Sequence, residues 1–171
     1  KNSYYKNKTP YNHYKKSGIN IIEHRTASAN QKNRPQLDKF AQDGQKFKND
    51  DYLIIDLRGN SGGSNIYASQ WVKNFSGKKP VELMIGSELS TLTANKLLEN
   101  SIKQSYGMEI EELDKEYQVL FDETSTGWSE VEYTQPIKID NDTLIFVLIG
   151  NSVASAGESF VEYLKQLENV I

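Results

Sequence analysis

Two short, continuously apolar runs, each followed by a loop of small residues, constrain most strongly what this chain can fold into. The first run, Leu53 to Ile55, leads into GNSGGS at positions 59–64. The second, TLIFVLIG at 143–150, leads into NSVASAG at 151–157. Runs without polar alternation are typical of parallel strands covered on both faces. Both loops would then leave the carboxyl edge of one sheet, where ligands bind in α/β folds.

The remaining pattern alternates strands with helices. INIIEH at 19–24 indicates a strand, and alternation at Val81, Leu83 and Ile85 indicates another. Ile137 and Ile139 alternate in the same way before the last apolar run. Helical spacing of apolar residues predicts helices over 37–47 (with Gly44 as a weak point), 66–75, 94–106 (ending at Gly107), 110–120 and 157–168. The sequence therefore predicts an α/β domain with a mainly parallel sheet and flanking helices.

Composition excludes several classes of function. The chain has 171 residues, a length typical of one domain, and we expect a core over 18–171. Positions 1–17 hold lysines and tyrosines without any acid, and they are interpreted as a polar basic lead-in. The formal net charge of -3 argues against a nucleic-acid binder. No apolar run is long enough to span a membrane. The sequence does not indicate which oligomeric state the protein adopts.

With no cysteine and two histidines, cysteine-ligated zinc, thiol catalysis and multi-histidine metal sites are excluded, and no metal or cofactor is expected. The chemistry must then come from serine, histidine, lysine and carboxylates. Ser155 lies where a buried strand turns into a helix, a position at which the next backbone amide can stabilise an oxyanion. The same residues also fit a plain helix cap, in which Ser152 or Ser155 caps and Glu158 completes a capping box.

The glycine loop strengthens the catalytic interpretation. Consecutive glycines permit positive φ angles and close backbone approach, so an amide of Gly62 or Gly63 can act as a second oxyanion donor. A phosphate-binding loop is the alternative, but the loop has neither G-x-G-x-x-G spacing nor the lysine of a Walker A motif.

Two motifs together carry a family resemblance. DYLIIDLRGNSGGS at 51–64 resembles the signature of the carboxyl-terminal processing (tail-specific) serine peptidases, and VLIGNSVASAGESFVEYL at 147–164 resembles their nucleophile segment. The resemblance implies a crotonase-like α/β fold and no cofactor. It further implies that the chain holds an incomplete catalytic domain, truncated on its C-terminal side.

The resemblance also assigns roles by position. Ser155 matches the nucleophile, and Ala156 together with Gly62 or Gly63 matches the oxyanion hole. Asp56, Arg58, Asn60 and Glu158 match positions that shape the loops, and we expect ion pairing of Arg58 with Asp56 or Glu158 to tie the two loops together. Val153 and Gly157 replace serines of the family motif, which leaves the subfamily open.

The general base has two candidates. The processing-protease branch uses a lysine on a strand after the nucleophile, which here would lie beyond Ile171. The tricorn-like branch uses a histidine before the glycine loop, and His24 stands at a comparable position.

We therefore predict a serine endopeptidase that cleaves extended polypeptides through an acyl-enzyme. The alternatives are a catalytically inactive peptide-binding or scaffold domain of the same fold and a crotonase-like acyl-CoA enzyme, which would not need Ser155. The resemblance and the absence of cysteine suggest an extracytoplasmic location, and the lysine-rich, asparagine-rich composition is typical of an AT-rich bacterial genome.

Overall fold

The computed structural model describes residues 9–82, 85–86, 89–106, 127–128 and 132–171. Their contacts form two compact units. The main unit comprises Lys1–Leu83 and Gln135–Ile171, and the insert unit comprises Met84–Thr134. The expectation of a single core over 18–171 did not anticipate this division.

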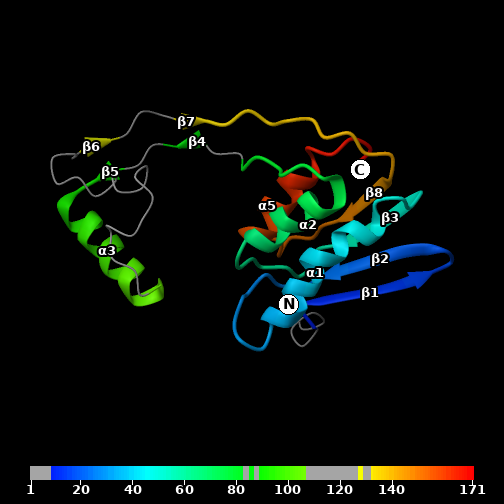
Figure 1. Cartoon of the computed structure of the whole chain (residues 1–171), viewed down its shortest axis with the longest axis horizontal. Coiled ribbons are helices and arrows are strands. Elements are labelled where there is room, and N and C mark those ends of the chain that lie inside the picture. Colours follow the sequence, from blue (N-terminus) through cyan, green and yellow to red (C-terminus); the bar gives the residue numbers. More distant parts are fainter. Residues whose placement is uncertain (1–8, 83–84, 87–88, 107–126, 129–131) are drawn as a thin grey trace. The chain divides into compact units, whose positions relative to one another are not determined.

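A four-stranded sheet forms the centre of the main unit, in the order β1-β2-β3-β8 (Figure 1). Its strands are β1 (Tyr11–Lys16), β2 (Ile19–His24), β3 (Tyr52–Asp56) and β8 (Leu144–Leu148). β1 pairs antiparallel with β2, whereas β2, β3 and β8 are parallel neighbours. The predicted α/β class with a mainly parallel sheet is confirmed, and the loops after β3 and β8 leave the same edge of the sheet.

Part of the predicted lead-in is a strand. Residues 11–16 form β1, and Ser17 and Gly18 both have positive φ angles, as in the tight turns that favour β-hairpins. Tyr11 is buried, and its hydroxyl donates a hydrogen bond to Asp43 (2.8 Å). The other side chains of β1 are exposed, which explains why this strand has a polar composition.

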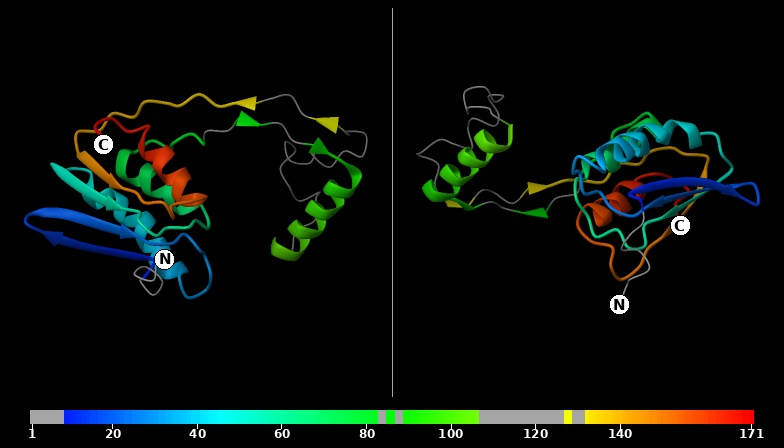
Figure 2. Two further views of the ribbon diagram at one scale, coloured as in Figure 1. Left: turned by 180° about the vertical axis from the view of Figure 1, so that it is seen from behind. Right: turned by 90° about the horizontal axis from the view of Figure 1, so that it is seen from below.

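Three helices pack on one face of the sheet (Figures 1 and 2): α1 (Arg34–Asp43), α2 (Ile66–Ser76) and α5 (Ala156–Leu164). Each contributes an aromatic side chain, Phe40, Trp71 and Phe160, to one buried cluster. Gly44 ends α1 and begins the 3-10 turn η2 (Gly44–Phe47), as the predicted weak point suggested. A Cβ at Gly44 would lie 2.4 Å from the Trp71 carbonyl oxygen, so this glycine lets η2 approach α2 closely.

The opposite face of the sheet is only partly covered. The prediction that both apolar runs are buried on both faces is wrong for β8, because Phe146 and Leu148 are 36% and 39% exposed. The reason is that α1, α2 and α5 all pack on the other face. The end of the chain pairs beside β8 instead, where Val170 forms a parallel bridge with Ile145.

The described residues of the insert unit form two short strand pairs and one helix. β4 (Ile85–Gly86) pairs with β7 (Glu132–Tyr133), and β5 (Leu89–Ser90) pairs with β6 (Gly127–Trp128). The predicted helix over 94–106 is confirmed as α3 (Leu92–Tyr106). The predicted helix over 110–120 lies outside the described residues.

Three predicted boundaries differ from the structure. Of the strand expected over 81–85, Ile85 lies in β4 and Val81 lies outside any strand, whereas positions 83 and 84 are outside the described residues. Ile139 forms only an isolated bridge with Leu167, and α5 ends at Leu164 rather than at 168.

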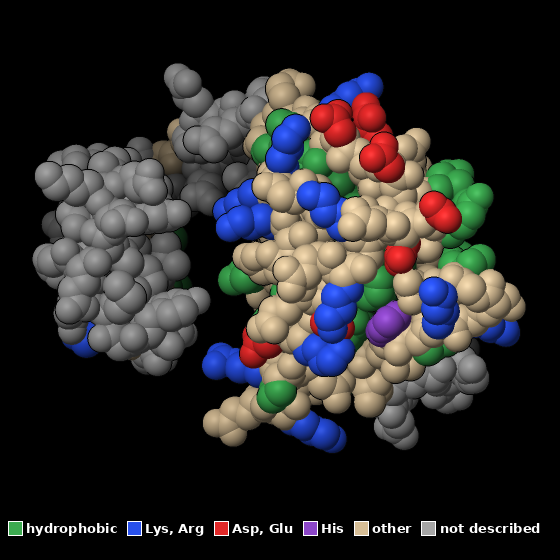
Figure 3. Space-filling model, turned by 45° about the vertical axis from the view of Figure 1, so that its right-hand side comes forward, with side chains coloured by type: hydrophobic (Ala, Val, Ile, Leu, Met, Phe, Trp, Pro, Cys, Tyr) green, Lys and Arg blue, Asp and Glu red, His purple; other side chains and the backbone are tan. Residues whose placement is uncertain are grey.

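The surface carries both signs of charge. On the face seen in Figure 3, lysine, arginine, aspartate and glutamate side chains lie among apolar and uncharged groups, without one continuous basic area. No helix in the described residues is long and apolar enough to cross a membrane.

Candidate active site

The loop after β3 begins at a buried carboxylate held by two arginines. Asp56 accepts hydrogen bonds from Arg25 (2.8 Å) and from the Arg58 guanidinium (2.8 and 3.0 Å), and the Arg58 backbone N–H donates to it as well. Burial alone would raise the pKa of Asp56, but the two guanidinium groups hold it well below its usual range. Arg58 pairs with Asp56, one of its two expected partners, but this ion pair joins the end of β3 to its own loop and does not tie the two loops together.

Arg25 is a structural residue that the sequence analysis missed. It follows β2 directly and is 4% exposed. Besides Asp56, its guanidinium bonds Glu23 and the backbone carbonyls of Asp56 and Arg58. It therefore fixes the start of the glycine loop from the neighbouring strand. The only signal in the sequence was an arginine immediately after a predicted strand.

The glycine loop folds around Asn60, which is fully buried. Its side-chain oxygen accepts a hydrogen bond from the Gly62 backbone N–H (3.0 Å), and its carbonyl accepts one from Ala154 (3.1 Å). Gly63 has a φ of 134°, and a Cβ there would lie 2.1 Å from the Ala27 carbonyl carbon. The backbone of residue 63 therefore requires glycine both for its conformation and for its close approach to the segment after β2.

The loop after β8 presents Ser155 at a sharp turn. Ser155 has φ 53° and ψ -126°, a conformation costly for a residue with a side chain, and it precedes the first turn of α5. Its backbone N–H donates to the Glu158 carboxylate (2.8 Å), which is the capping contact expected for Glu158. Gly157 allows α5 to approach the glycine loop, since a Cβ there would lie 2.9 Å from the Asn60 carbonyl oxygen.

The two loops meet at Ser155. A Cβ placed on Gly62 would lie 3.0 Å from the Ser155 Oγ, so the glycine loop passes directly beside the hydroxyl. Ser155, Ala156 and Gly63 line one pocket of about 500 Å³, which we call the serine pocket. Among the described residues, the backbone N–H groups of Gly63 and Ala156 donate no hydrogen bond, whereas that of Gly62 is taken by Asn60. Of the two glycines predicted as oxyanion donors, Gly63 is therefore the one whose backbone N–H is not taken by Asn60.

His24 lies in the hydrophobic core rather than in the serine pocket. It is 1% exposed, and its ring stacks on Phe40 with centroids 4.1 Å apart. Burial lowers the pKa of His24 to about 3, although the Pro10 carbonyl beside it acts in the opposite direction. The ring therefore stays neutral at ordinary pH, and it is not among the residues that line the serine pocket.

The serine pocket is otherwise lined by acids and neutral polar groups. Glu82, Glu158 and Glu162 contribute carboxylates, and no lysine or histidine is among the described residues that line it. The described residues contain no group of three metal-binding side chains.

Comparisons with solved structures find similar chains at low sequence identity. A point mutant of CPAF superposes with a TM-score of 0.53 at 15% identity, covering 94% of this chain and 38% of that one. Mature CPAF complexed with lactacystin gives 0.49 at 19% identity, covering 90% and 37%. A putative peptidase from Parabacteroides merdae gives 0.49 at 16% identity, covering 98% and 44%.

The chain therefore spans less than half the length of each of these structures. No match was found among curated proteins. A family model described as peptidase family S41 matches residues 19–171, which include both β3 and β8 loops. The chain belongs to peptidase family S41.

Proposed function

We propose that the protein is a serine-type endopeptidase in which Ser155 is the nucleophile. The observation that carries the proposal is the strained backbone of Ser155, held beside the glycine loop at the end of a parallel strand. Strain of this kind clusters at functional sites, because the rest of the fold must offset its cost. A serine that merely caps a helix has an unstrained, extended backbone.

The geometry supports acyl transfer through a covalent ester. The Ser155 Oγ bonds to the carbonyl carbon of the scissile peptide while its proton passes to a base. The free amides of Gly63 and Ala156 donate to the oxygen as it becomes negative. The C–N bond then breaks and the amine leaves with the proton. Water gives a proton to the base, attacks the ester, and the proton returns to Ser155 as the acid product departs.

The reaction also requires a general base. His24 fits the role poorly, because a stacked, buried ring with a pKa near 3 is a weak proton acceptor. The lysine predicted beyond Ile171 stays a prediction. An extended polypeptide as substrate and a location outside the cytoplasm also remain predictions from the family.

The test is covalent labelling of the natural protein with a fluorophosphonate probe. We expect labelling that Ser155→Ala abolishes and that Ser159→Ala leaves intact. Ser159 is the matched control, because its side chain lines the same pocket one helical turn away. His24→Leu should retain labelling, whereas loss of labelling in a folded His24→Leu protein would restore that histidine as the base. Absence of labelling in folded wild-type protein would refute the serine peptidase.

A catalytically inactive peptide-binding domain is the second candidate. It is favoured by the absence of lysine and histidine from the described lining of the serine pocket. This candidate predicts peptide binding without labelling. A crotonase-like acyl-CoA enzyme would instead retain thioester hydrolysis in Ser155→Ala.

A further inference from the structure

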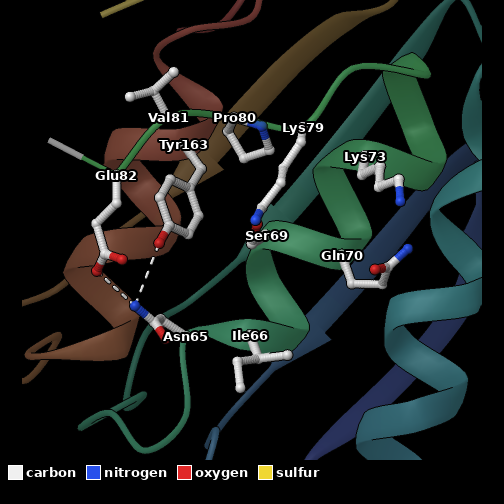
Figure 4. Close-up of a pocket in the computed structure, with 10 residues that line it drawn as sticks. All are labelled: Asn65, Ile66, Ser69, Gln70, Lys73, Lys79, Pro80, Val81, Glu82 and Tyr163. Atoms are coloured by element: carbon white, nitrogen blue, oxygen red, sulfur yellow. Dashed lines mark hydrogen bonds between the residues drawn. The ribbon is translucent and has the colours of Figure 1, made fainter. Parts of the chain in front are cut away.

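A second pocket adjoins the serine pocket on the side of α2. It has a volume of about 550 Å³ and lies between α2 and the segment 79–82 (Figure 4). Asn65, Glu82 and Tyr163 line both pockets, so these three residues form a shared wall. A group bound in the second pocket would therefore flank a peptide bond held at Ser155.

The far side of this second pocket is cationic. Lys73 on α2 and Lys79 in the following segment both line it, together with the hydroxyl-bearing Ser69 (Figure 4). Both lysines are exposed residues, and neither forms an ion pair with another described residue. Two ammonium groups are thus available to a ligand, next to a neutral hydrogen-bonding side chain.

The pocket also contains one acid, Glu82, but this carboxylate is engaged on the shared wall. The Asn65 side-chain amide donates to Glu82 (2.6 Å) and to the Tyr163 hydroxyl (3.3 Å). Burial raises the pKa of Tyr163, and the charge of Glu82 adds to this effect, so the phenol stays protonated. The two lysines outnumber the single carboxylate in the pocket.

We propose that the second pocket binds a carboxylate of the peptide substrate through Lys73 and Lys79. The proposal rests on the proposed function of Ser155, since it places this carboxylate beside the scissile bond. The carboxylate is that of an Asp or Glu side chain near the scissile bond. Ammonium–carboxylate hydrogen bonds are stronger than neutral ones and give selectivity against uncharged analogues.

Binding to Ser155→Ala tests the proposal without requiring turnover. The probes are fluorescein-labelled decapeptides of Ala, Ser and Val with a central Glu or Gln, each made with a free or an amidated C-terminus. Fluorescence anisotropy should give roughly tenfold tighter binding for the Glu peptide than for the Gln peptide, with either C-terminus. A preference only for the free acid over the amide would identify the chain end as the bound carboxylate and would overturn the proposal.

Charge-removing variants locate the effect. Lys73→Gln combined with Lys79→Gln should abolish the preference, whereas Lys78→Gln should keep it. Lys78 is the matched control because it is adjacent in sequence, does not line the pocket and faces Asp140 (3.9 Å). Equal affinity for all four peptides, no measurable binding, or a preference that survives the double variant would overturn the proposal.

The two proposals fail separately. Labelling at Ser155 without any carboxylate preference would contradict only the proposed role of the second pocket. A preference that depends on the two lysines, in a protein that no fluorophosphonate labels, would contradict only the proposed peptidase activity.

Discussion

The loops after β3 and β8 face each other across the candidate active site, yet they are held in opposite ways. The β3 loop is supported from a distance, by Arg25 on its Asp56 carboxylate and by Ala27 against Gly63. The β8 loop is held mainly by its own helix, through Glu158 at the first turn, and it carries the strained Ser155. One loop is a rigid support and the other stores strain. Changes in the first should destabilise the fold, and relief of the second should stabilise it.

The largest effects are expected for Arg25→Met and for Gly63→Ala. Without Arg25 the Asp56 carboxylate keeps its half-exposed partner Arg58 but loses its buried one, and the backbone carbonyls of Asp56 and Arg58 lose a donor. The loss in the free energy of unfolding should therefore be about 3 kcal/mol, the lower end of the cost of breaking a buried ion pair. Arg58→Met is the matched control, because it removes a guanidinium from the same Asp56 but its side chain is 47% exposed. An exposed pair contributes about 1 kcal/mol or less. Urea denaturation measures both, and equal losses would contradict support from β2.

Gly63→Ala should destabilise by about 3 kcal/mol, from the positive φ angle and the clash with Ala27 together. Gly18→Ala separates the two causes. Gly18 also has a positive φ (85°), but a Cβ there meets nothing within 4 Å, so it should cost only about 1 kcal/mol. Similar losses for both variants in urea denaturation would show that the contact with Ala27 contributes little.

The contrast between the loops also explains what the sequence could predict. Strands β2 and β3 could be predicted because short apolar runs in the sequence indicate buried strands. The contact between Ser155 and Glu158 could be predicted because a helix cap joins residues that are close in sequence. The role of Arg25 in holding the Asp56 carboxylate could not be predicted, because the two residues are 31 positions apart in the sequence. The choice between Gly62 and Gly63 depends on which amide Asn60 occupies, and no spacing rule specifies that.

Two further differences have the same origin. His24 ends β2 as predicted, but whether its ring faces a pocket or the core depends on the helices α1 and α5 that cover it. The insert was not anticipated as a separate unit, although its helix α3 was predicted, because the strands in its described part have only two residues each and leave no periodic signal.

The buried His24 at the end of β2 should make the stability of the fold depend on pH. Folded His24 stays neutral down to about pH 3, whereas an unfolded histidine takes up a proton below about pH 6.5. The unfolded state therefore binds more protons in this window, and stability falls as pH is lowered, by at most about 1.4 kcal/mol per pH unit. His24→Leu should flatten this part of the pH–stability curve. An unchanged slope in the folded variant would mean that other groups cause it.

The smallest expected effect concerns Ser155 itself and has the opposite sign. Ser155→Gly should be about 1 kcal/mol more stable than Ser155→Ala, because glycine adopts φ 53° without steric cost, and this gain exceeds the entropy that glycine adds to the unfolded chain. Neither variant can react with a fluorophosphonate, so the comparison isolates backbone strain from chemistry. Urea denaturation of the two proteins decides it. If alanine proves as stable as glycine, position 155 is unstrained, and the conformation on which the proposed nucleophile depends has no energetic cost for the fold to offset.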